Sequence, residues 1–334
     1  MPKVNLSAEA LARIASKEGK YDQAPELVGI VGYINTDTLK IADLRGKVVL
    51  VDFWTYTCIN CIRTFPFLTE WDRKYRDKGL VIIGVHTPEF EFEKKKENVV
   101  QATERYGIAY PVVQDNEYAT WSAYRNRFWP RKYLIDQDGF IRYDHIGEGA
   151  YQETELKIQE LLAEIGEEVT EEIMEAEEPR KIRLQTPELY AGYAFALPRG
   201  QNLGNTGGFQ TEEQFMYTLP STILRNVIIL DGLWQSNQDN LEAKEAGASL
   251  VLDYTASQVN IVLNEAQLEV EVFIDDAYIT PELAGDDVTF SNGKATMQVD
   301  QARLYNVVNG PHGRHTLRLT TNAPGWSLNA FTFG

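Results

Sequence analysis

The chain has 334 residues, of which 43% are apolar and 24% are charged, a composition typical of globular proteins with room for two domains. Its net charge of −17 argues against nucleic acid and anionic membrane surfaces as partners, because like charges repel. No apolar run approaches the roughly 18–20 residues that cross a bilayer, so no membrane span is expected.

Residues 1–23 are predicted to form an N-terminal helical extension. The opening Met1–Glu9 stretch lacks the apolar segment of a secretory signal, so the sequence as written predicts a cytoplasmic protein. If an export segment precedes this sequence in the natural protein, an extracytoplasmic location is expected instead.

Residues 24–166 are predicted to form an α/β domain with a mixed central sheet flanked by helices, because strand-like and helix-like segments alternate. The apolar run Val48–Trp54 suits a central strand, and apolar residues then recur at helical spacing from Ile62 to Tyr75. The other expected elements are strand Leu80–Val85, helix Lys94–Tyr106, strand Tyr110–Gln114, a short helix around Tyr118–Arg127, a hairpin of Lys132–Asp136 and Phe140–Ile146 with an Asp-Gly turn at Asp138-Gly139, and a closing helix Gln152–Ile165.

Residues 167–198 are predicted to form an acidic linker, since residues 164–178 contain eight Glu and no Lys or Arg. Residues 199–334 are predicted to form an all-β antiparallel sandwich of the jelly-roll kind, because short strand-like runs alternate with turns. Turns are expected at Asn292-Gly293 and Asn309-Gly310. The strand candidates are Asn226–Leu230, Ser249–Tyr254, Gln258–Leu263, Glu269–Ile274, Ala295–Val299, Arg303–Val308 and His315–Thr320.

The chain contains only two cysteines, Cys58 and Cys61, which lie between the predicted strand Val48–Trp54 and the following helix. Two cysteines separated by only two residues, with none elsewhere in the chain, indicate a reactive pair rather than a scaffold held together by disulfides. The free N–H groups and the dipole of a helix start favour the thiolate form of Cys58. Cys58 is therefore predicted to attack a disulfide, and Cys61, one turn further in, to resolve the mixed disulfide.

A zinc site is the alternative explanation of the cysteine pair, with His86 and His145 as further ligands. No second ligand pair has the spacing of a structural metal site, so dithiol chemistry is preferred. That chemistry needs neither a metal nor another cofactor, and none is expected.

The stretch Val51–Cys61 resembles the active-site segment of thioredoxins and of TlpA/ResA-type thiol-disulfide oxidoreductases. Three further segments, Leu44–Leu50, Lys78–Val85 and Trp129–Asp136, resemble the lead-in to the active-site strand, the next strand and the cis-proline loop of that group. The resemblance runs in consistent order from Ala24 to Ile165 and implies a thioredoxin-like domain.

The resemblance also implies roles for individual residues. Cys58 and Cys61 match the redox pair, Pro130 the cis-proline that faces it, and Pro66 the proline that kinks the active-site helix. Asp52 matches a buried acid that passes protons to and from the inner thiol, a role that fits a carboxyl in an apolar strand because burial raises its pKa. A surface-facing acid is the alternative for Asp52. The residues expected to contact substrate are Trp54, Ile59, Asn60, Trp129 and His86.

Two departures from the group concern its redox properties. Thr57 stands where the group usually has Trp, and Ile59-Asn60 replaces the more common dipeptide between the cysteines. Because that dipeptide tunes the reduction potential, the sequence leaves open whether the protein acts as a reductant or as an oxidant.

The Thr55–Cys61 segment, the loop from His86 to Phe90 and the second half together resemble the soluble C-terminal region of DipZ-type proteins. That region joins a thioredoxin-like domain to a sandwich similar to a carbohydrate-binding module. In the second half the resemblance rests on Tyr217–Pro220, Leu230–Trp234, Arg303–Tyr305 and Ala330–Gly334. Carbohydrate binding is not favoured, because aromatic residues mostly fill cores. The aromatic residues concerned are Trp234, Tyr254, Tyr278, Tyr305 and Trp326.

These observations predict a thiol-disulfide oxidoreductase that exchanges its dithiol with protein substrates and takes electrons from an upstream donor. A thiol peroxidase is one alternative, with Thr55 three residues before Cys58, although Val51 stands where that class has Pro. The other alternative is a binding or adaptor protein whose sandwich recognises a ligand.

Overall fold

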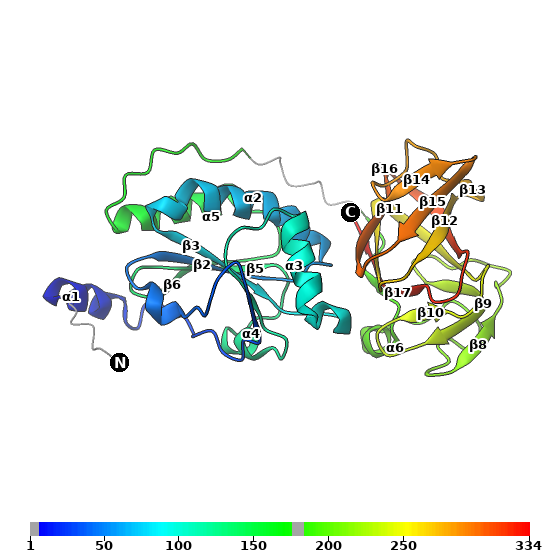
Figure 1. The fold of residues 1–334 in the computed structure, drawn as a ribbon, viewed down its shortest axis with the longest axis horizontal. Coiled ribbons are helices and arrows are strands. Elements are labelled where there is room, and N and C mark those ends of the chain that lie inside the picture. Colours follow the sequence, from blue (N-terminus) through cyan, green and yellow to red (C-terminus); the bar gives the residue numbers. More distant parts are fainter. Residues whose placement is uncertain (1–6, 176–183) are drawn as a thin grey trace. The chain divides into compact units, whose positions relative to one another are not determined.

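The computed structural model describes residues 7–175 and 184–334, and the chain divides into two compact units, Met1–Pro179 and Arg180–Gly334 (Figure 1). Within the described ranges, no helix combines the length and the apolar character that crossing a membrane requires. The first unit carries both cysteines, and the second is built mainly from strands.

A six-stranded mixed sheet forms the centre of the first unit, in the order β1-β4-β3-β2-β5-β6. Its strands are β1 (Gly32–Ile34), β2 (Val48–Trp54), β3 (Leu80–His86), β4 (Val112–Gln114), β5 (Arg131–Ile135) and β6 (Ile141–Ile146). Strand β3 pairs in parallel with β2 and β4, and the other pairs are antiparallel. The carboxyl ends of β2 and β3 therefore meet at one edge of the sheet, the edge at which such sheets usually carry their sites.

Helices cover both faces of this sheet, with α2 and α5 on one face and α4 on the other (Figure 1). The helices are α1 (Ala8–Lys17), α2 (Ile59–Tyr75), α3 (Lys96–Arg105), α4 (Ala119–Ala123) and α5 (Tyr151–Glu164). Because side chains alternate along β2, Phe53 packs against Tyr124 at the end of α4, whereas Trp54 packs against Phe65 of α2. By the same alternation the Asp52 side chain points toward α2, the helix whose N-terminus carries the two cysteines.

Ion pairs fix helix α1 to the β5–β6 hairpin. Lys17 Nζ lies 2.6 Å from a carboxylate oxygen of Asp136 and 2.9 Å from one of Asp138, and Arg13 Nε lies 2.6 Å from Asp138. Both aspartates are buried, so the two cations balance negative charges that have lost most of their contact with water. The hairpin turns at Gly139, whose φ of 84° confirms the expected Asp-Gly turn.

The predicted strands and helices of the first unit are present. Strand β2 has the predicted bounds, and in the other elements at least one end shifts by one or more residues. The short helix expected around Tyr118–Arg127 is α4, which covers only Ala119–Ala123. Strand β1 has no counterpart among the predicted elements, because three residues are too few to show the alternation that identifies a strand.

The second unit is an all-β domain whose strands in residues 184–334 form one hydrogen-bonded antiparallel network. Its strands are β7 (Leu189–Tyr190), β8 (Gln214–Tyr217), β9 (Ile229–Ser236), β10 (Leu241–Ala243), β11 (Ser249–Leu263), β12 (Leu268–Ile274), β13 (Ala277–Tyr278), β14 (Val288–Ser291), β15 (Lys294–Val299), β16 (Arg303–Thr321) and β17 (Ser327–Phe333). Strand β16 pairs with both β11 and β12, and β11 also pairs with β9 and β17. The two longest strands thus connect most of the network.

The structure corrects the strand predictions at these two long strands. The candidates Ser249–Tyr254 and Gln258–Leu263 are both parts of β11, and the candidates Arg303–Val308 and His315–Thr320 are both parts of β16. The turn predicted at Asn309-Gly310 is wrong, because Asn309 pairs with Gln258 inside the ladder. Register shifts on either side of this pair mark irregularities that interrupt the sequence pattern without ending the strands.

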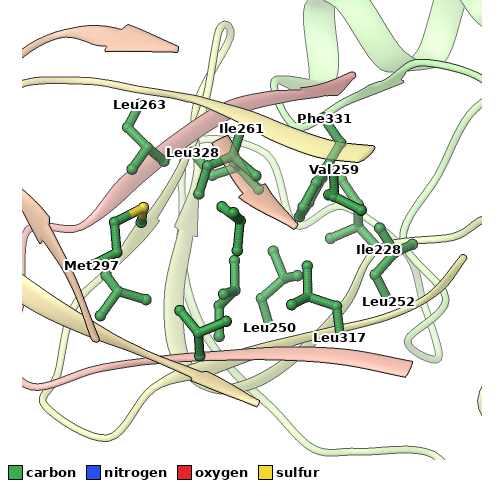
Figure 2. Packing of buried hydrophobic residues seen from close by; sticks show 14 of the residues in the cluster. Ile228, Leu250, Leu252, Val259, Ile261, Leu263, Met297, Leu317, Leu328 and Phe331 are labelled. Carbon is green, nitrogen blue, oxygen red and sulfur yellow. The ribbon is translucent and has the colours of Figure 1, made fainter. Parts of the chain in front are cut away.

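An apolar cluster fills the interior of the second unit. Figure 2 shows Leu250, Val259, Ile261 and Leu317 pointing into it from β11 and β16. Trp234, Tyr254, Tyr305 and Trp326 are also completely or almost completely buried, and Tyr278 is half-buried. Most of the aromatic residues considered for sugar stacking therefore belong to the core.

The second unit begins earlier in the chain than residue 199, where the sequence predicts it to begin. Strand β7 pairs with β17, and the short helix α6 (Tyr193–Ala196) follows it within the same unit. The predicted linker 167–198 therefore includes residues of the β domain, while its part at 176–183 lies outside the described residues.

Candidate functional site

The two cysteines lie where β2 passes into α2. Cys58 is the N-cap of α2, and its Sγ accepts a hydrogen bond from the backbone N–H of Cys61 at 3.2 Å. Cys58 is partly exposed and Cys61 completely buried, and both are free thiols. The structure therefore presents one sulfur to solvent, where it accepts a hydrogen bond from the start of α2, and keeps the other sulfur behind it.

Burial raises the pKa of the Cys61 thiol well above its ordinary value. The hydrogen bond with Cys58 and the negative charges of Cys58 and Asp52 raise this pKa further. Cys61 is therefore a neutral thiol at physiological pH and needs a nearby base before it can act as a nucleophile.

Asp52 is placed to be that base. It is completely buried on β2, and among residues 7–175 and 184–334 neither of its carboxylate oxygens finds a hydrogen-bond partner. Burial raises the pKa of Asp52 to about 7, although the charge of Lys132 lowers it in part. A carboxyl group with this pKa can both accept and release a proton near neutrality.

Lys132 is a site residue that was not predicted from the sequence. It lies directly opposite Asp52 in the antiparallel register of β2 and β5, and it is 1% exposed. Burial lowers the pKa of Lys132, and the Asp52 charge opposes that shift. A lysine followed at once by Tyr133, Leu134 and Ile135 in a predicted strand is the signal that could have pointed to it.

The loop before β5 contains the predicted cis-proline. The Trp129–Pro130 peptide bond is cis, and the next residue, Arg131, pairs with Phe53, so Pro130 lies at the end of β2 that leads to Cys58. Trp129 is half-buried, and its Nε1 donates a hydrogen bond to the carbonyl oxygen of Thr87 at 3.1 Å. This bond links the cis-proline loop to the loop that follows β3.

The structure corrects two predicted substrate contacts. Trp54 and His86 are completely buried and pack against each other with ring centroids 5.0 Å apart, so a substrate outside the protein cannot reach either side chain. Burial also lowers the pKa of His86 to about 3. Ile59 is half-buried and Asn60 is exposed, and their contact with substrate stays a prediction, as does that of Trp129.

In residues 7–175 and 184–334, no three His, Cys, Asp or Glu side chains come close enough together to hold a metal ion. His86, one of the two histidines of the zinc alternative, is enclosed by Trp54 and Tyr56. The geometry around the cysteines is thus that of a dithiol with a nearby buried acid.

Comparisons with known proteins agree with this geometry. Residues 22–161 match the Redoxin family model, and residues 186–334 match a model described as thioredoxin like C-terminal domain. The chain is 40% identical over 246 residues to Protein DipZ of Mycobacterium bovis, an alignment that covers 72% of this chain but only 35% of DipZ.

Two further relatives align with this chain over most of their own length. The thiol-disulfide oxidoreductase ResA of Bacillus thuringiensis is 31% identical over 133 residues, which are 40% of this chain and 73% of ResA. The thiol-disulfide oxidoreductase YkuV of Bacillus subtilis is 26% identical over 140 residues, which are 42% of this chain and 94% of YkuV. The chain therefore belongs to the thioredoxin-like thiol-disulfide oxidoreductase family.

Proposed function

We propose that this protein exchanges its Cys58–Cys61 dithiol with disulfides of protein substrates through a mixed disulfide. The observation that carries the proposal is the arrangement of a partly exposed, helix-capping thiol in front of a buried thiol with a buried acid beside it. Membership of the family supports this chemistry. That the substrates are proteins is part of the proposal.

The first step is attack by the Cys58 thiolate on one sulfur of a substrate disulfide. A bond forms between Cys58 and that sulfur, the substrate disulfide breaks, and the other substrate sulfur leaves as a thiolate. The hydrogen bond from the Cys61 N–H to Cys58 Sγ stabilises the attacking thiolate before this step.

The second step releases the substrate. The ionised Asp52 carboxylate takes the Cys61 proton, the Cys61 thiolate attacks Cys58 Sγ, and the second substrate sulfur leaves. Two electrons have then passed to the substrate, and the protein holds a Cys58–Cys61 disulfide that an upstream dithiol donor reduces again. The same steps in reverse oxidise a substrate dithiol.

A trapping experiment with Cys61→Ser tests this function. The variant should hold a disulfide substrate such as insulin as a covalent adduct that dithiothreitol releases, because the residue that resolves the mixed disulfide is absent. The double variant Cys58→Ser/Cys61→Ser is the matched control and should form no adduct. If Cys61→Ser forms no adduct, or if the unmodified protein consumes peroxide at a steady rate but leaves insulin intact, the proposal fails.

A further inference from the structure

Glu93 is a completely buried carboxylate in the 3-10 turn Glu91–Lys94, which connects β3 to α3. One of its oxygens accepts hydrogen bonds from the hydroxyl groups of Thr55 at 2.5 Å and Thr57 at 2.6 Å. The other oxygen accepts from the backbone N–H groups of Glu89 at 2.5 Å and Phe90 at 2.9 Å. All four donors therefore converge on a single side chain.

The four hydrogen bonds match what an ionised carboxylate needs when it is removed from water. A carboxylate only accepts hydrogen bonds, and its two oxygens offer about four lone-pair sites. Burial raises the pKa of Glu93, while the bonds from Thr55, Thr57 and the two backbone groups lower it. A buried charge without such partners would be strongly destabilising, so this site is built around the carboxylate.

The donors belong to the two loops that flank the reactive cysteine. Thr55 and Thr57 lie between the end of β2 and Cys58, and Glu89 and Phe90 lie in the loop after β3. The N–H of Cys58 donates to the Thr55 carbonyl oxygen at 3.3 Å, so the position of Thr55 bears directly on that of the cysteine.

The aromatic ring of Tyr56, which lies between Thr55 and Thr57 in the sequence, is also held in place. Tyr56 stacks on His86, with ring centroids 5.6 Å and planes 19° apart, and Thr55 Oγ1 lies 3.4 Å from His86 Nε2. Each of the three residues before Cys58 thus has a contact with Glu93 or with His86. Neither partner is exposed, so these contacts are part of the protein interior and not a substrate surface.

We infer that Glu93 is the positioning residue of Cys58, because its carboxylate clamps the Thr55–Thr57 segment that places Cys58 at the start of α2. The inference rests on the proposed function and deepens it, since it explains what holds the attacking sulfur in place. Without the clamp, the segment would move away from this position and Cys58 Sγ would leave the N–H groups of α2 for part of the time.

Two variants remove the clamp in different ways. Glu93→Gln keeps the size of the side chain and removes the charge, and Thr57→Val keeps the shape of threonine and removes one donor. Thr103→Val is the matched control, since Thr103 is buried and its hydroxyl donates to the carbonyl oxygen of Val100 in α3, away from the Thr55–Thr57 segment in sequence. The measurements are the alkylation rate of Cys58 by iodoacetamide, kcat/KM for insulin reduction, and the equilibrium of the cysteine pair with glutathione.

We expect Glu93→Gln and Thr57→Val each to lower the Cys58 alkylation rate and kcat/KM by about tenfold, the effect typical of losing a hydrogen bond to a charged group. The equilibrium constant with glutathione should shift in both variants, because a displaced Cys58 thiolate loses its helix N–H partner. Thr103→Val should change none of these values by more than about twofold. In the double variant, Thr57→Val should add little to Glu93→Gln, since both act on one contact.

Three results would overturn the inference. The first is an unchanged Cys58 alkylation rate in a folded Thr57→Val protein. If Glu93→Gln does not fold, Thr57→Val alone provides the test. The second is a rise in the rate in Glu93→Gln, which would show that charge and not position links Glu93 to Cys58. The third is full additivity in the double variant. Because alkylation reports on Cys58 directly, the test stands even if insulin reduction fails in the unmodified protein and the proposed function falls.

Discussion

Cys58→Ala is expected to lower the rate of insulin reduction by dithiothreitol to the uncatalysed rate. Cys58 is the partly exposed sulfur and accepts a helix N–H bond, while Cys61 is completely buried and has a raised pKa. Cys61 therefore cannot replace Cys58 as the attacking group. The measurement is the precipitation of the insulin B chain at neutral pH, with the protein at equal concentration in each assay.

The matched control for Cys58→Ala is Cys61→Ala, which leaves the attacking sulfur in place. This variant should lose multiple turnover but still form one covalent adduct per molecule, because only the resolving step is removed. Catalysis by Cys58→Ala above one tenth of the normal rate would contradict the assignment, as would an alkylation experiment in which Cys61 reacts faster than Cys58.

Asp52→Asn is expected to slow the release of the mixed disulfide by about 10²-fold at pH 8, the lower end of what a general base contributes. The Asp52 pKa of about 7 means that the carboxylate can accept the Cys61 proton above this pH and not below it. The release rate of the unmodified protein should therefore fall as the pH drops through about 7, and in Asp52→Asn this step in the profile should disappear. Single-turnover kinetics across this range measure both effects.

Lys132→Met provides the control for the charge near Asp52. Lys132 lies opposite Asp52, and its charge lowers the Asp52 pKa. Its removal should move the step in the pH profile to higher pH while the rate at the high-pH plateau changes little. If the pH profile of Asp52→Asn still shows this step at the same pH as the unmodified protein, the titrating group is another residue and Asp52 is not the base.

Asp52→Asn should also change the stability of the protein in a way that depends on pH. The folded-state pKa of about 7 lies above the ordinary value of 3.8, so the folded state binds more protons than the unfolded state between these values. The free energy of unfolding therefore decreases as the pH rises through this window, by up to about 4 kcal/mol. The variant lacks this loss, so it should be more stable than the unmodified protein in urea at pH 8, and the difference should vanish near pH 3.5.

The sequence predicts the fold of the first unit well, because its elements are long and strongly patterned. The apolar run of β2, the helical spacing in α2 and the Asp-Gly turn before Phe140 each identify one element without reference to the others. The same holds for the cysteine pair, whose position between strand and helix follows from local sequence alone.

The sequence does not show which side chains meet in space. Strand β2 is buried on both faces, so no polar alternation reveals that Asp52 turns toward α2 or that Trp54 is enclosed. Lys132 is eighty residues from Asp52 along the chain and meets it only through the β2–β5 register. In the alternating Glu91–Lys94 segment, Glu93 looks like a surface charge, and only the fold brings Thr55 and Thr57 to it.

The attachment of α1 determines how far the first unit can be shortened. The Redoxin match begins at residue 22, beyond this helix, yet Arg13 and Lys17 supply cations to the buried Asp136 and Asp138. A protein trimmed to residues 22–161 would keep both acids and lose these two counterions. The helix is therefore an integral part of the first unit, and a shortened protein that contains this unit should retain it.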